Sequence, residues 1–344
     1  MPYSPIVQLD RGTSMRAGAL PHRCVSWKRM SSSSTSAVAD QDHVAVTAPQ
    51  SRAANDGALV PILTVVASTA FFAMGDVAAK MLTDTVPAIE VTWLRYVVFC
   101  AMVLPTVLLI QGPSAMRTGH VRLQIIRGIG MVCSSVLFIL GLRHLSVVSA
   151  SAINFVSPIF ITALSIPMLG EKIGIRRWTA AAVGFAGVVI VVRPGGETFS
   201  AAALLPMAAA ASWAVAAIST RMMSSERPDT TLAWSALVGL IVLSVFVPFE
   251  WHTPTWREIG LAVLMGGFST IGHWLVVLAY RKAEVSTLAP FSYVQLVFAG
   301  ILGFAVFGSI PDAWTLVGGA IIAASGLYTA HRERVRARGE RRRS

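Results

Sequence analysis

Long apolar stretches, separated by short polar segments, recur along most of this chain. About 20 consecutive apolar residues are needed for an α-helix to span a bilayer. A transmembrane β-barrel would instead require short segments of alternating polar and apolar residues, a pattern that this sequence lacks. The pattern therefore predicts an all-α polytopic membrane protein with ten transmembrane helices. We expect the helices at residues 59–82, 88–110, 123–142, 147–169, 175–192, 201–222, 230–249, 258–280, 286–307 and 313–330.

One of these stretches occurs twice, at residues 142–171 and 280–309. Each copy follows a glycine-containing apolar helix and begins with Arg beside His or Lys. With five helices in each half, the second half enters the membrane from the opposite side. The sequence thus predicts two five-helix inverted repeats, at residues 58–193 and 200–330. The matched positions are Arg143/Arg281, Val147/Val285, Val156/Val294, Phe160/Phe298, Leu164/Leu302 and Gly170/Gly308.

Composition agrees with a membrane protein, because 54% of the residues are hydrophobic and only 13% are charged. A soluble protein carries about 25% charged residues. The net charge of +11 does not indicate nucleic-acid binding, because much of it comes from the arginines of residues 332–343. We interpret residues 331–344 as a basic cytoplasmic tail that faces anionic lipid. The expected partners are thus the lipid bilayer and a small-molecule substrate, with no nucleic acid and with a homodimer left open.

The N-terminal residues 1–57 are polar and include the serine run Ser31–Ser34. No apolar segment of the kind found in cleavable signal peptides follows. An organellar transit peptide is one interpretation, but we favour a disordered tail or a start placed too early. With the N-terminus inside, short inner loops hold more Lys and Arg than outer loops. This distribution predicts an inner or plasma membrane protein with both termini in the cytoplasm.

Charged residues within the expected spans are candidates for function, since each is costly to insert into a membrane. Asp76 and Lys80 lie four residues apart on the first span, hence on one face. Arg95 lies at a comparable depth in the second span, about 10 Å from the same surface. Two interpretations stay open: a structural Asp76–Arg95 ion pair with Lys80 extended outward, or charged groups that face the substrate. His273 is either bonded to a neighbouring helix or a protonatable cavity group.

Polar residues of the repeated stretch form a second group of candidates. Asn154, Tyr293 and Gln295 come near the midplane, where inverted-repeat transporters bind substrate. Such side chains also join helices by hydrogen bonds, which is the alternative role. Phe72 and Trp213 occupy equivalent positions of the two halves and are either walls of a cavity or packing residues.

Several short motifs resemble the EamA family of the drug/metabolite transporter superfamily. They are Glu90-Val-Thr-Trp-Leu-Arg95, the segment from Ser149 through Pro158 to Gly170-Glu171, residues 289–295 and Pro311-Asp312. The last two resemble a subset that includes S-adenosylmethionine carriers. Ser309 stands where the second repeat of the family usually has Glu. The resemblance covers residues 59–330 and implies a ten-helix carrier whose fourth helix ends at the Gly170-Glu171 pair. Proline bends membrane helices, so Pro158 is expected to bend this helix. We assign Pro158, Glu171 and Lys80 to structural or gating roles.

We therefore expect a secondary transporter that moves a small amphiphilic metabolite, an amino acid or a related compound, by alternating access. The alternative is a carrier of S-adenosylmethionine or another nucleotide derivative. A membrane-embedded enzyme is a remote alternative, because neither HExxH nor GxSxG occurs and the histidines are scattered. The three cysteines have no metal-binding spacing. No catalytic residue, cofactor or metal is predicted, and the missing GxxxxGK[ST] motif excludes direct use of ATP through a P-loop.

Overall fold

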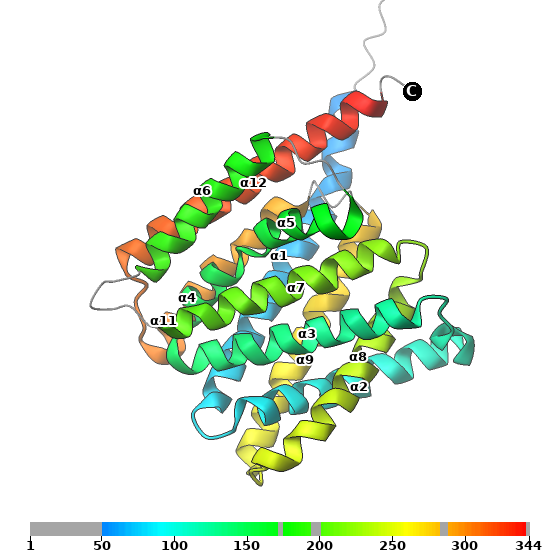
Figure 1. Cartoon of the computed structure of the whole chain (residues 1–344), viewed down its shortest axis with the longest axis vertical. Coiled ribbons are helices and arrows are strands. Elements are labelled where there is room, and N and C mark those ends of the chain that lie inside the picture. Colours follow the sequence, from blue (N-terminus) through cyan, green and yellow to red (C-terminus); the bar gives the residue numbers. More distant parts are fainter. Residues whose placement is uncertain (1–49, 171–174, 194–200, 283–287, 342–344) are drawn as a thin grey trace, which may run out of the picture. The chain divides into compact units, whose positions relative to one another are not determined.

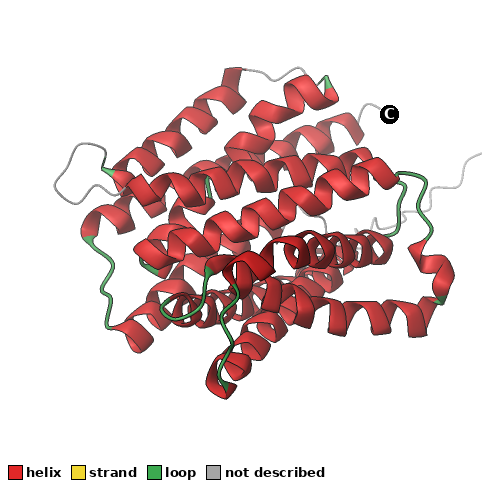
Figure 2. Cartoon of the chain, turned by 60° about the horizontal axis from the view of Figure 1, so that its bottom comes forward, coloured by secondary structure: helices red, strands yellow, loops and turns green. Residues whose placement is uncertain are grey.

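The structure is a computed structural model that describes residues 50–170, 175–193, 201–282 and 288–341. These residues form helices joined by short loops, with no strand among them (Figure 2). The α-helices are α1 Gln50–Thr83, α2 Ala88–Gln111, α3 Val121–His144, α4 Val147–Asn154, α5 Ser157–Leu169, α6 Ile175–Val192, α7 Leu204–Met222, α8 Pro228–Phe246, α9 Trp256–Lys282, α11 Val294–Phe307 and α12 Ala313–Arg341. The 3-10 helices are η1 Pro113–Met116, η2 Ala201–Ala203, η3 Val247–Glu250 and η4 Ala289–Tyr293.

The helices are long and apolar enough for a membrane protein. Seven segments of the described chain reach the length and hydropathy of a membrane span, and three shorter apolar helices accompany them, at Trp178–Val192, Phe291–Phe307 and Ala313–Tyr328. Large apolar side chains lie on outward faces, among them Leu109 and Trp256 at 85% and 89% exposure. Such apolar surfaces are more stable in lipid than in water. The helices can lie in lipid because they satisfy their backbone hydrogen bonds internally. The chain is an integral membrane protein.

The helices pack largely in pairs distant in sequence (Figure 1). α1 lies along α9, α3 along α7, α2 along α8, and α6 along α12. Glycines permit the closest of these approaches: a Cβ atom on Gly187 of α6 would lie 2.8 Å from the carbonyl oxygen of Gly318 in α12. Small residues let membrane helices approach in this way, where apolar lipid leaves little hydrophobic drive for association.

Two expected helices differ from the sequence prediction because they are interrupted. The segment predicted as one helix at 147–169 ends as α4 at Asn154 and resumes as α5 at Ser157. The segment predicted at 286–307 begins, in its described part, as the 3-10 helix η4. A proline accompanies each interruption, Pro158 in the first turn of α5 and Pro290 within η4, and proline has no N–H for a helical hydrogen bond. Two further helices exceed their predicted bounds, since α1 begins within the predicted polar tail and α12 continues into the predicted basic tail.

One end of the bundle is closed by a packed apolar core. Leu82, Val91, Ile139 and Leu142 are fully buried there, where α1 ends, α2 begins and α3 turns into α4. Lys80 Nζ donates hydrogen bonds to the carbonyl oxygens of Leu142 at 2.7 Å and Leu145 at 2.8 Å. A cation is favoured at this position because the last carbonyls of a helix carry partial negative charge. The prediction that Lys80 extends outward is therefore wrong: it binds the turn between α3 and α4.

Candidate functional site

A cavity of about 570 Å³ lies within the helix bundle. Its walls come from both halves of the chain, and they include all eight residues that the sequence singled out as substrate-binding candidates, together with Pro158. These residues are Phe72, Asp76, Arg95, Asn154, Trp213, His273, Tyr293 and Gln295. The structure thus brings them together, while substrate binding by them stays a prediction. Lys80 belongs to the closed end described above, and Glu171 falls outside the described residues.

Two opposite charges line this cavity without forming a direct ion pair. Asp76 accepts a hydrogen bond from Gln295 Nε2 at 3.1 Å, which joins the first half of the chain to the second. Arg95 Nη1 instead donates to Ser135 Oγ at 3.4 Å. The Asp76–Arg95 ion pair considered from the sequence is not among the ion pairs of the described residues. Asp76 is buried and Arg95 is partly buried, and enclosed charges without an ionic partner are costly.

His273 stands against aromatic rings in the cavity wall. Its ring lies edge-on to Phe72 with 4.8 Å between ring centroids, and Phe99 is 6.1 Å away. Nδ1 lies 2.8 Å from the carbonyl oxygen of Ser269 in the same helix. Because a carbonyl only accepts, Nδ1 carries the hydrogen. The expected bond to a neighbouring helix is therefore wrong for Nδ1, and the ring is fixed by its own helix.

Tyr293 is the last residue of η4, within the second repeated stretch. Its ring lies 5.0 Å from that of Phe155, centroid to centroid. Its hydroxyl lies so close to Gly326 of α12 that a Cβ atom at position 326 would overlap it. Gly326 therefore provides the space that Tyr293 occupies. Trp213, 37% exposed, belongs to the part of the wall that α7 forms.

Sequence reasoning missed part of the cavity wall. Ser134, Ser135 and Ser151 line it, but single serines do not interrupt an apolar helix and gave no signal. Phe155 lines it as well, and its position directly after Asn154 was an available signal. Arg221 lies in the last turn of α7 and also lines the cavity. It aligns with Lys80 between the two halves, which was the second available signal.

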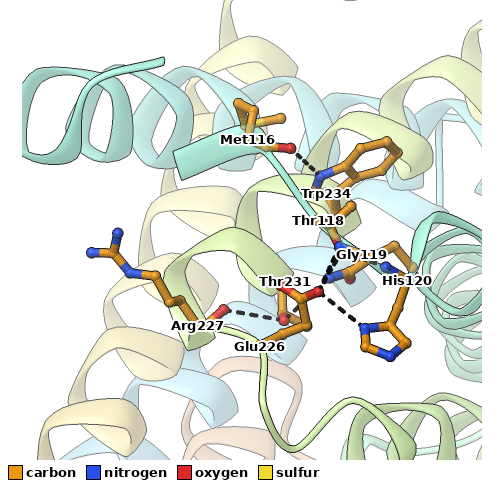
Figure 3. Close-up of polar contacts among 9 residues, drawn as sticks. Met116, Thr118, Gly119, His120, Glu226, Arg227, Thr231 and Trp234 are labelled. Carbon is orange, nitrogen blue, oxygen red and sulfur yellow. Dashed lines mark hydrogen bonds and ion pairs between the residues drawn. The ribbon is translucent and has the colours of Figure 1, made fainter. Parts of the chain in front are cut away.

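Loops at one end of the bundle meet at a single carboxylate, in a group that we call the Glu226 cluster (Figure 3). Glu226 Oε1 accepts hydrogen bonds from Thr118 Oγ1 at 2.8 Å, the Gly119 amide at 2.9 Å and His120 Nδ1 at 3.1 Å. The hydrogen bond from His120, followed by that from Thr118, lowers the pKa of Glu226 below its ordinary value of 4.5. The cluster joins the α2–α3 loop to the α7–α8 loop.

A corresponding group at the other end is the Glu258 cluster. Thr255 precedes α9, and its amide and hydroxyl donate to Glu258 Oε2 at 2.7 and 2.9 Å. This Thr-x-x-Glu arrangement is a capping box, which satisfies free backbone groups at a helix start. The other carboxylate oxygen accepts from Thr85 Oγ1 at 2.5 Å, which joins the α1–α2 loop to α9. Among the residues the structure describes, no group of three or more His, Cys, Asp or Glu side chains is arranged to hold a metal ion.

An all-helical membrane protein with an internal cavity, lined from both halves by charged and aromatic groups, is built as a transporter. Residues 59–193 and 200–329 match the EamA-like transporter family. The match covers more than half of the chain, and the chain belongs to this family. Its role is therefore transport rather than catalysis.

Similar proteins include an S-adenosylmethionine uptake transporter of Rickettsia bellii (strain RML369-C), 29% identical over 79% of this chain and 92% of the relative. A riboflavin transporter of Vibrio cholerae is 27% identical, over 74% of this chain and 87% of the relative. A pseudopaline exporter of Pseudomonas aeruginosa is 24% identical, over 77% and 93%. A solved crystal structure with 21% identity shares the fold at a TM-score of 0.57, over 81% of this chain and 98% of the other.

Proposed function

We propose that this protein is a secondary transporter that moves a small amphiphilic metabolite, an amino acid or a related compound, by alternating access. The observation that carries the proposal is the cavity of about 570 Å³, in which Asp76 and Arg95 present opposite charges. An α-amino acid group carries an ammonium and a carboxylate, and these match the two charges. Apolar rings such as Phe72 would contact the rest of the molecule. A cavity of this size accommodates a metabolite rather than a polymer.

The proposal includes ten transmembrane helices in two inverted repeats, residues 58–193 and 200–330. The helix contacts support it. In the proposed repeats, the counterparts are α1 and α7, α2 and α8, α3 and α9, α5 and α11, and α6 and α12. Exchanging each helix for its counterpart turns the α1–α9 contact into α7–α3, the α2–α9 contact into α8–α3, and the α1–α11 contact into α7–α5. All six contacts occur in the structure. The α2–α8 and α6–α12 pairs are their own counterparts and also occur.

Matching local structure in the two halves supports the same proposal. The interruption after Asn154 has its counterpart where η4 meets α11, at Tyr293. Gly170 and Gly308, one matched pair of the repeated stretch, end α5 and α11 with φ angles of +67° and +65°. Only glycine adopts this left-handed conformation readily, so both ends require it. Transporters with inverted repeats bind substrate where such interrupted helices meet.

The alternative within transport is a carrier of S-adenosylmethionine or another nucleotide derivative. Relatives named as S-adenosylmethionine uptake transporters support it, and so do the carboxylate and aromatic rings of the cavity. Relatives named for riboflavin and for pseudopaline leave the substrate open within the family. For either substrate class, we propose that both termini lie in the cytoplasm, as the distribution of basic loop residues predicts.

Uptake into proteoliposomes tests the proposal. Purified protein is reconstituted and assayed with radiolabelled amino acids, S-adenosylmethionine and riboflavin. We expect saturable uptake of one class, and a loss of roughly tenfold or more in Gln295→Leu, which removes the bond to Asp76. Tyr293→Phe tests the cavity hydroxyl, with Tyr328→Phe as the matched control, because Tyr328 is 47% exposed and lies outside the cavity wall. Transport insensitive to Gln295 and Tyr293 would contradict the proposed site.

A further inference from the structure

The end of α4 within the membrane span has an unusual electrostatic character. α4 stops at Asn154, and the residue four positions later is Pro158, which has no N–H to bond the Asn154 carbonyl. The amide of Val156 bonds the carbonyl of Ile153 instead of continuing the α-helical pattern. A helix C-terminus carries partial negative charge on its last carbonyls. This end of α4 therefore favours a positive group.

Two side-chain oxygens on α4 add to this character. Ser151 Oγ and Asn154 Oδ1 are both enclosed, and neither has a hydrogen-bond partner among the residues that the structure describes. The residues are three positions apart, so they share a face of the helix. Both line the cavity. Enclosed polar atoms in proteins nearly always have a partner, so these two oxygens add two unfilled acceptor positions to the cavity wall at the end of α4.

A carboxylate completes the set. Asp76 is 8% exposed and lines the same cavity, where its hydrogen bond comes from the neutral amide of Gln295 rather than from a cation. The rings of Phe155 and Tyr293, 5.0 Å apart, are in the same wall. Aromatic ring faces attract cations, and most strongly where water is excluded. The basic residues of the wall, Arg95 and Arg221, are on α2 and α7, so neither belongs to α4.

We infer that the end of α4 is the subsite for a positively charged group of the substrate, a sulfonium or an alkylammonium, held by Asp76, Asn154, Ser151 and the Phe155–Tyr293 rings. This inference rests on the proposed function, because it assigns one part of the transported molecule to one part of the cavity. Arg95 then meets the carboxylate of the same molecule. The substrate class is an organic cation that also carries a carboxylate.

Two pairs of compounds isolate the charge. S-adenosylmethionine and S-adenosylhomocysteine differ by one methyl group and the positive charge that it confers on sulfur. L-lysine and L-norleucine differ by a side-chain ammonium. Dissociation constants are measured by titration calorimetry on the full-length protein in detergent. We expect the charged member of one pair to bind roughly tenfold or more tightly than its neutral partner. The pair that shows the preference tells a sulfonium from an ammonium.

Variants then test whether the preference for the charged compound depends on Asp76 and Asn154. Asp76→Asn and Asn154→Leu should each reduce the preference for the charged member by roughly tenfold. Asn154→Asp adds a carboxylate and should increase the preference. Thr106→Val is the control, because Thr106 is exposed and bonds the Met102 carbonyl of its own helix. Circular dichroism and gel filtration confirm the fold of each variant, and Asn154→Asp keeps the test decisive if another variant does not fold.

Two outcomes would overturn the inference. Equal binding within both pairs would show that the cavity does not recognise a sulfonium or a side-chain ammonium. A preference that survives in both Asp76→Asn and Asn154→Leu would place the cation elsewhere. Either result is compatible with saturable uptake into proteoliposomes, so the proposed transport function would stand. Failure of all four compounds to bind would overturn the subsite as stated, and the uptake panel would then judge the proposed function separately.

Discussion

The loops at the two ends of the bundle are joined in the same way with the roles of donor and acceptor exchanged. At one end, Glu226 follows α7 and accepts from Thr118, which precedes α3. At the other end, Thr85 follows α1 and donates to Glu258, in the first turn of α9. An offset of 141 aligns α1 with α7, and Thr85 then falls on Glu226. Both clusters are present in the same structure, so these loop contacts are alike at the two ends of the bundle.

Another aligned pair differs between the same two ends. Lys80 is bound to the carbonyls of Leu142 and Leu145 at the turn between α3 and α4. Arg221, its counterpart at the same offset, is exposed and lines the cavity. From this comparison, we expect the loop clusters to act as fixed joints and the Lys80 contact to belong to one conformation. Alternating access requires one end to open as the other closes, so we expect the Lys80 contact to break during transport.

Chemical tethers test the difference between the Lys80 contact and the loop clusters, and we expect them to have the largest effect on uptake. In a background without Cys24, Cys100 and Cys133, paired cysteines at 80 and 145 are joined by a bifunctional thiol reagent. We expect this tether to abolish proteoliposome uptake, since the closed end could no longer open. The same reagent joining cysteines at 85 and 258, across the Glu258 cluster, should leave at least about half of the uptake, as expected for a fixed joint.

Each tethered protein is compared with its untreated form and with its two single-cysteine variants. Mass spectrometry of proteolytic fragments establishes that the tether has formed. If the 80–145 tether leaves uptake intact, the Lys80 contact is permanent and the proposed difference between the joints is wrong. If the 85–258 tether also abolishes uptake, the Glu258 cluster must move during transport, and the claim that the loop clusters are fixed joints is wrong.

A smaller effect is expected in the stability of variants at Lys80 and at its counterpart Arg221. Lys80→Met removes two charge-assisted hydrogen bonds, and we expect the free energy of unfolding to fall by about 1–2 kcal/mol, because the side chain is only half-buried. Arg221→Met, the matched change at the counterpart position, should alter it by less than about 0.5 kcal/mol. Denaturant unfolding in mixed micelles measures both. Equal losses in the two variants would remove the asymmetry.

Acidification gives the smallest effect and concerns the Glu226 cluster. The folded-state pKa of Glu226 is lowered by its hydrogen bonds from His120 and Thr118. A lowered pKa means that the ionised carboxylate stabilises the fold above the ordinary value of 4.5, and that this contribution is lost as the pH falls through the folded-state pKa. Glu226→Gln should therefore have a lower melting temperature than wild type at pH 7, and the difference should shrink below about pH 4.5.

The control for this prediction is Glu250→Gln, an exposed carboxylate in η3 at the other end of the bundle. Its melting temperature should follow wild type across the same pH range. Melting is followed by fluorescence from pH 7 to about pH 3.5. A difference between wild type and Glu226→Gln that stays constant with pH would show that the carboxylate charge is irrelevant to the cluster.

The sequence predicted the helical class and the charged and aromatic candidates that line the cavity, because both leave a strong signal. Long apolar segments can only span a membrane as helices, and charged residues such as Asp76 and Arg95 are conspicuous within them. The partners of those residues were not predictable. Asp76 bonds Gln295 and Lys80 bonds two backbone carbonyls, and these contacts depend on how the helices are placed in three dimensions.

The interruption of the helix after Asn154 was also not predictable from hydropathy. Pro158 indicated a bend, since proline cannot complete the helical hydrogen bond. Hydropathy continues unchanged through residues 147–169, so the pattern gave one helix where the structure has two. Single serines such as Ser135 and Ser151 are compatible with an apolar helix on any face. Their position on the cavity wall follows from packing alone.

The bonds of Asp76 and Lys80 also set an order for the synthesis of the protein. The Leu142 carbonyl that receives Lys80 lies 62 residues further along the chain, and Gln295 follows Asp76 by 219 residues. At about 5–20 residues per second, a ribosome makes these partners roughly 3–12 s and 10–40 s later. Helix α1 therefore enters the bilayer before the final partners of Asp76 and Lys80 have been made, although a charged residue costs about 2.5–3.5 kcal/mol at the centre of a span. Until the later helices arrive, its remaining apolar side chains hold it in the membrane.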